Sequence, residues 1–111
     1  IRDRYNMEIT PREFSSMVML VRDALLEMKK VLDYTGDVAA NYMKMEARCR
    51  KIYVFEERGD EFYREEIRRL FTEKQSAAYM IYWKDILVDV ERMLDAAAGA
   101  ATLLQKLFVR V

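Results

Sequence analysis

The chain has 111 residues, 52% of them hydrophobic, and its 19 lysines and arginines balance 19 aspartates and glutamates, so its formal net charge is zero. This length and composition suit one domain with a hydrophobic core, and the charge balance argues against a nucleic-acid-binding protein, which normally has an excess of basic residues. Three glycines and one proline are few interruptions in a sequence rich in helix formers, so the composition predicts an all-α protein.

The first predicted helix covers residues 11–34. Thr10 suits the N-cap, Pro11 the first turn and Glu13 the third position of a capping box. Gly36 is expected to end this helix, and Asp37 to cap the next one. Apolar residues recur at steps of three and four, which predicts a buried face made of Phe14, Met17, Val21, Leu25, Met28 and Leu32.

Two longer helices are predicted over residues 37–73 and 77–109, with Ser76 as the N-cap of the last one. The apolar positions of the second helix are Val38, Tyr42, Met45, Cys49, Ile52, Tyr63, Ile67 and Leu70. Those of the third are Met80, Trp83, Leu87, Val90, Leu94, Ala97, Ala101, Leu104 and Phe108. Such sustained coiled-coil-like spacing predicts an antiparallel three-helix up-down-up bundle over residues 1–111.

The apolar face of the second helix turns acidic after Ile52. Continuing its spacing leads to Glu56 and Gly59, with Asp60 next to them. In an antiparallel pair that turns near Gln75-Ser76, Glu56 comes level with Asp95, and Asp60 with Glu91. Each helix therefore contributes a Glu-x-x-x-Asp pair, with both carboxylates on one helix face.

Four carboxylates at one level repel one another unless a cation lies among them, and oxygen ligands suit magnesium, manganese or iron better than thiol-preferring metals. Glu56, Asp60, Glu91 and Asp95 are therefore the candidate metal ligands. The alternative is that no metal binds and that Arg58, Arg64 and Arg92 neutralise these carboxylates, because acidic pairs with this spacing recur elsewhere in the chain.

Other kinds of site are not indicated. The sequence has no histidine, which excludes histidine-based acid–base catalysis and the Glu-x-x-His ligands of di-iron bundles. It has no glycine-rich phosphate loop, and Cys49 lies at an apolar position where it is expected to be a buried filler. We therefore predict that the protein is not an enzyme. The longest apolar run, Ala96 to Leu104, is too short to span a bilayer, so a cytoplasmic location is expected.

Two segments resemble the PhoU-like family, in the branch found beside Pit-type phosphate permeases. Residues 55–71, FEERGDEFYREEIRRLF, are similar to that branch's L-E-x-x-A-D-x-x-Y-R segment, with Gly59 in place of alanine. The segment Ile81-Tyr82-Trp83-Lys84-Asp85-Ile86, followed by Glu91 and Asp95, is similar to its I-K-W-K-E-I segment. The C-terminal residues 107–111 also resemble the family's ending.

The resemblance implies a helical regulator of phosphate uptake that acts through protein contacts. Its partner would be a phosphate permease or the regulatory proteins of that permease, and the regulator itself would be at most peripheral to the membrane. It implies that Glu56, Asp60, Glu91 and Asp95 hold iron or another divalent metal (Mn, Mg or Zn). Because the family usually contains two three-helix bundles, it also implies that this chain is the C-terminal half of such a protein.

Two alternatives stay open: a metal-storing or metal-sensing bundle, and a structural module that dimerises and binds no metal. The run Ala96-Ala97-Ala98-Gly99-Ala100-Ala101 contains only small residues, which suits close packing or the docking of another bundle. A lone bundle with such a surface and no net charge is expected to form a homo-oligomer under each of these hypotheses.

Overall fold

The computed structural model describes residues 11, 13–73 and 75–109, and every regular element in these residues is helical. Helix α2 covers Phe14–Asp33, the 3-10 helix η1 covers Tyr34–Asp37, α3 covers Val38–Thr72 and α4 covers Ala77–Val109. The prediction of an all-α protein is confirmed.

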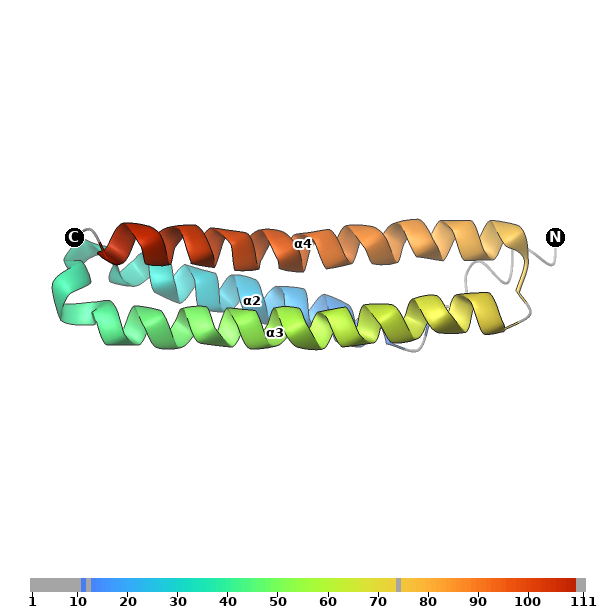
Figure 1. Cartoon of the computed structure of the whole chain (residues 1–111), viewed down its shortest axis with the longest axis horizontal. Helices are drawn as coiled ribbons and strands as arrows, with labels where there is room; N and C mark the ends of the chain where they lie inside the picture. The colour runs from blue at the N-terminus through green and yellow to red at the C-terminus, as the bar shows by residue number, and fades with distance from the viewer. Residues whose placement is uncertain (1–10, 12, 74, 110–111) are drawn as a thin grey trace.

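The three α-helices lie side by side along the long axis of the molecule (Figure 1). The 3-10 helix η1 joins α2 to α3 at one end, and the connection between α3 and α4 lies at the other end. The molecule measures 59 × 18 × 16 Å. Its length follows from α3 and α4, which at 1.5 Å per residue are each about 50 Å long, whereas α2 is about 30 Å long.

Helix α2 begins at Phe14, three residues later than predicted. Glu13 occupies the N-cap position but its side chain makes no capping hydrogen bond, and Thr10 lies outside the described residues. Instead, the backbone N–H of Glu13 donates to Oε1 of Glu66 on α3, at 3.2 Å. A carboxylate from a distant helix therefore takes the role that the sequence assigned to a local capping box.

The other two predicted caps are confirmed. Asp37 Oδ1 accepts a hydrogen bond from the backbone N–H of Ala40 at 3.1 Å, and Ser76 Oγ accepts one from that of Tyr79 at 3.1 Å. The glycine terminus predicted for the first helix is wrong, because Gly36 lies inside η1 and no described residue has a positive φ angle.

The predicted apolar faces of α3 and α4 form the core. Buried side chains of α3 are Met45, Cys49, Ile52 and Leu70, and those of α4 are Tyr79, Trp83, Leu87, Val90, Leu94, Ala97, Ala101 and Phe108. In α4 the burial departs from prediction mainly at Met80, which is half-buried while its neighbour Tyr79 is buried. One buried stripe therefore runs almost the full length of this helix.

The predicted face of α2 is partly wrong. Leu25 and Leu32 are 56% and 51% exposed, while the buried positions of this helix are Met17, Leu20, Ala24, Glu27 and Val31. The reason is that α2 has apolar residues on more than one face, so that its periodicity alone did not determine which face packs against α3.

None of the described helices has an apolar stretch long enough to cross a membrane.

Candidate metal centre

Three of the four predicted ligands lie together between α3 and α4. Glu56 comes from α3, and Glu91 and Asp95 from α4; each offers a carboxylate oxygen, and these oxygens lie within 4.8 Å of one another. Glu56 and Glu91 are half-buried and Asp95 is exposed. An arrangement of this kind can offer a cation three oxygen ligands from two rigid helices, with the exposed side open to water.

Asp60, the fourth predicted ligand, does not join this group. Its Oδ2 forms an ion pair with Nη1 of Arg64, one turn further along α3, at 2.8 Å. Asp60 is still near enough for its charge to act on Glu56 and Glu91. We therefore regard Asp60 as a neighbour of the group, which we call the carboxylate cluster: Glu56, Glu91 and Asp95.

A close approach of the two helices brings the carboxylate cluster together. Gly59 is buried one turn after Glu56, and a Cβ added there would collide with Cδ1 of Leu94, the residue before Asp95. Because glycine has no side chain, Leu94 can pack directly against the backbone of α3. The same contact holds the carboxylates of α4 near Glu56.

The electrostatics of the cluster are unfavourable when all three carboxylates are ionised. Burial, a hydrogen bond shared with Asp95 and the charges of Asp95, Asp60 and Glu56 raise the pKa of Glu91 from 4.5 to about 7. Burial and a hydrogen bond shared with Asp95 likewise raise the pKa of Glu56, with further contributions from neighbouring carboxylates. At neutral pH Glu91 is therefore partly protonated, and a bound cation would displace its proton.

Of the arginines proposed as neutralising partners, one pairs with a predicted ligand, Asp60, and none contacts the carboxylate cluster itself. Arg64 pairs with Asp60, and Arg92 contacts Asp89 at 3.7 Å. Within the described part of the chain, no lysine or arginine nitrogen lies within 4.0 Å of a cluster carboxylate. The repulsion within the cluster is therefore relieved by protons or by a bound cation, not by a direct ion pair with a described residue.

Sequence reasoning missed two buried carboxylates, Glu66 and Glu27, which are 2% and 7% exposed. Glu66 accepts hydrogen bonds from the backbone of Glu13 and from Arg69 Nη1 at 2.8 Å, and burial raises its pKa although Arg69 opposes the shift. Glu27 pairs with Arg48 at 3.2 Å. Both lie at three- or four-residue steps along the buried faces, which was the signal available in the sequence. Because their partners satisfy them, we assign them structural roles.

Cys49 is fully buried, and burial together with the charge of Glu46 raises the pKa of its thiol. A buried thiol with a raised pKa is a poor nucleophile, which agrees with its interpretation as an apolar filler.

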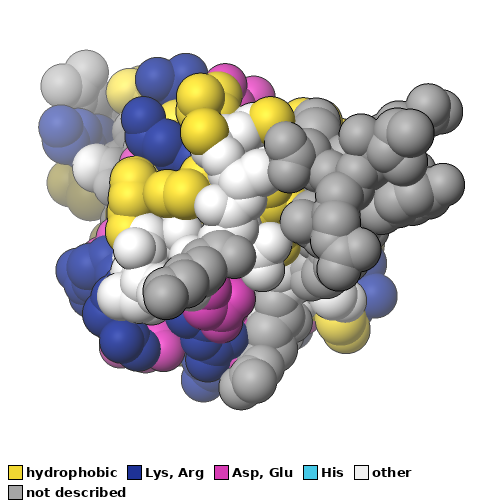
Figure 2. All heavy atoms as spheres, turned by 90° about the vertical axis from the view of Figure 1, so that its right-hand side faces the viewer, with side chains coloured by type: hydrophobic (Ala, Val, Ile, Leu, Met, Phe, Trp, Pro, Cys, Tyr) yellow, Lys and Arg dark blue, Asp and Glu magenta, His cyan; other side chains and the backbone are white. Residues whose placement is uncertain are grey.

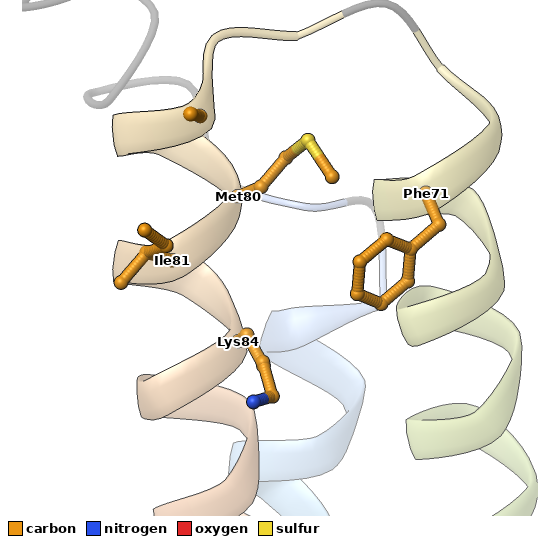
Figure 3. Close-up of a pocket in the computed structure, with 5 residues that line it drawn as sticks. Phe71, Met80, Ile81 and Lys84 are labelled. Carbon is orange, nitrogen blue, oxygen red and sulfur yellow. The ribbon is translucent and has the colours of Figure 1, made fainter.

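The end of the molecule near the α3–α4 connection carries a small apolar pocket of about 140 Å³. Figure 3 shows Phe71 on α3 facing Met80 and Lys84 on α4 across it, with Ile81 beside them. Figure 2 looks onto this end and shows hydrophobic side chains next to lysines and arginines. The pocket is smaller than the roughly 300–1,000 Å³ of typical small-molecule sites, so we do not assign it a ligand.

Comparison of the chain with protein-family models, with curated proteins and with solved structures finds no match.

Proposed function

We propose that this protein is a helical module that binds a divalent cation through the carboxylate cluster. The observation that carries this proposal is the convergence of Glu56, Glu91 and Asp95 from two helices, with oxygens within 4.8 Å of one another. The raised pKa of Glu91, about 7, supports it: burial, the hydrogen bond with Asp95 and the neighbouring carboxylates disfavour the ionised form, and a bound cation would stabilise that form. The three helices would form an antiparallel up-down-up bundle, a rigid frame for such a site.

The chemistry of the ligands favours hard or borderline cations. The cluster offers only carboxylate oxygens, which suit Mg²⁺, Mn²⁺ and Fe²⁺ and are less suited to Zn²⁺, which usually has nitrogen or sulfur ligands. The protein would supply binding and orientation, and its role would be sensing, storage or structural control instead of catalysis.

The test is thermal unfolding of chelator-treated protein with and without each of these four cations. A cation present at about a hundred times its dissociation constant should add about 2.7 kcal/mol to the free energy of unfolding. The double variant Glu56→Gln/Asp95→Asn should lose this increase. Asp60→Asn is the matched control and should keep most of it, because Asp60 pairs with Arg64 outside the cluster. If no cation raises the melting temperature, the proposal fails.

A second candidate is a PhoU-like regulator of phosphate transport, which would work through protein contacts near a membrane transporter. It is favoured by the resemblance of residues 55–71 and 81–95, and by the fact that the carboxylates shared with that family include the whole cluster. Affinity purification of the intact protein from its own cells tests this candidate. Repeated enrichment of a phosphate permease or its regulators would support it, and their consistent absence would count against it.

A further inference from the structure

Three basic side chains surround one buried carboxylate between α2 and α3. The carboxylate belongs to Glu27 of α2. Lys30 approaches it from the same helix, and Arg48 and Lys51 approach it from α3. The nitrogens Arg48 Nη1, Lys30 Nζ and Lys51 Nζ lie 3.4, 3.6 and 4.0 Å from the same oxygen, Oε1 of Glu27. We call these four residues the basic cluster.

The basic cluster has more positive charge than its carboxylate needs. A buried glutamate is satisfied by one well-placed basic partner, and Arg48, at 3.2 Å from Oε2, is sufficient for Glu27. Lys30 and Lys51 then leave two positive charges in excess. The carboxylate is buried, whereas the side chains of Lys30, Arg48 and Lys51 are 49%, 28% and 55% exposed, so the excess charge lies on the solvent side.

The carboxylates nearby on α2 and α3 do not cancel this excess. Three of them have basic partners of their own at 3.0, 3.7 and 4.0 Å, in the pairs Asp23–Arg22, Asp33–Lys29 and Glu46–Arg50. Among the described residues, Glu27 is the one carboxylate within 4.0 Å of Lys30, Arg48 or Lys51. Residues 47–55 of α3 contain three basic residues and no acidic residue.

Helix α4 contributes no charge at this level either. The carbonyl oxygen of Ala101 lies 4.0 Å from Sγ of Cys49, the residue after Arg48, so the middle of the second half of α4 is level with the basic cluster. Between Asp95 and Lys106, α4 has no charged residue. The positive excess of the basic cluster is therefore balanced by solvent ions or by a bound anion.

The charge and the donors of the basic cluster indicate the class of anion. Two surplus positive charges match a doubly charged anion, whereas a carboxylate ligand would leave one of them unbalanced. One guanidinium and two ammonium groups from two helices donate from different directions, which suits the tetrahedral oxygens of a phosphate group. At pH values above about 7 a phosphate group carries nearly two negative charges.

We propose that the basic cluster binds a phosphate group, with Lys30, Arg48 and Lys51 as donors and Glu27 holding the three basic side chains together. The lysines are half exposed, so water screens their charges. The expected dissociation constant for free phosphate is therefore in the millimolar range. This site lies apart from the carboxylate cluster and needs no divalent cation.

Nuclear magnetic resonance of the isotope-labelled whole chain tests the proposal. The chelator-treated protein is titrated with inorganic phosphate to about 50 mM, at constant ionic strength maintained with sodium chloride. We expect saturable shifts concentrated at the amides of Lys30, Arg48 and Lys51. Sulfate, which has the same charge and shape, should give the same pattern. Shifts that do not saturate, or that are equal at basic residues along the whole chain, would show screening alone and overturn the proposal.

Two variants test the assignment of the donors. Lys30→Gln/Lys51→Gln should weaken phosphate binding about tenfold, because it removes two exposed charge contacts and leaves the pair of Glu27 with Arg48 intact. Lys29→Gln is the matched control: it removes a neighbouring charge that pairs with Asp33, and it should bind like wild type. Equal weakening in the control and in the double variant would refute the assignment.

A second arm distinguishes free phosphate from a lipid headgroup. Vesicles of phosphatidylcholine with and without phosphatidic acid are sedimented with the protein at the same ionic strength. Retention by phosphatidic acid that the double variant loses, without saturable shifts from free phosphate, would assign the phosphate group to a lipid. Binding in neither arm would overturn the proposal. Because the protein is free of metal in both arms, this failure would not affect the cation proposal.

Discussion

The raised pKa of Glu91 makes a quantitative prediction about stability and pH. Its pKa is about 7 in the folded protein and 4.5 for an ordinary glutamate, so the folded state holds more protons than the unfolded state between these two pH values. Stability contributed by Glu91 is therefore highest below about pH 4.5 and decreases as the pH rises towards 7. Glu91→Gln removes this dependence, because glutamine does not ionise.

The magnitude follows from the size of the shift. The difference between about 7 and 4.5 corresponds to about 3 kcal/mol at most. Since Glu91 is only half-buried, solvent screening reduces the effect, and we expect about 1 kcal/mol. Without added metal, Glu91→Gln should thus be more stable than wild type by about 1 kcal/mol at pH 8, and the two should be nearly equal at pH 4.5.

The assay is thermal unfolding followed by circular dichroism from pH 4.5 to 8.5, in the presence of a chelator. A gain of 1 kcal/mol should raise the melting temperature by about 4–8 °C in a domain of this size. Asp85→Asn, at an exposed position of the same helix, is the control and should follow the wild-type curve. If the difference between Glu91→Gln and wild type is the same at all pH values, the raised pKa of Glu91 is refuted.

Three further predictions concern stability and reactivity. Gly59→Ala should lower the free energy of unfolding by about 1 kcal/mol, because the collision with buried Leu94 outweighs the gain in helix propensity; a stabilised variant in chemical denaturation would contradict this. Glu66→Ala should lower the free energy of unfolding by about 3 kcal/mol in the same assay, since it leaves Arg69 and the N–H of Glu13 without their partner. A decrease below about 1 kcal/mol would contradict this prediction. Cys49 should react with a thiol reagent only at the rate of unfolding, and rapid labelling of native protein would show that the thiol is accessible.

The sequence predicts the buried face of a helix correctly where that helix has a single apolar stripe. In α4 the stripe from Trp83 to Phe108 stands out against polar neighbours, and its predicted positions are nearly all buried. In α2 it was insufficient, because Leu25 and Leu32 continue an apolar spacing as regular as that of Leu20, Ala24 and Val31. Which stripe is buried depends on the partner helices, and spacing within α2 contains no information about them.

The candidate site was predicted in part for a similar reason. Equal distance from the α3–α4 connection placed Glu56 level with Asp95, and the structure brings these carboxylates together with Glu91. Asp60 lies outside this group because a local interaction, the ion pair with Arg64, competes with the contact across helices. Glu66 was missed because one of its two partners, the backbone N–H of Glu13, lies 53 residues away in the sequence; the other, Arg69, is local.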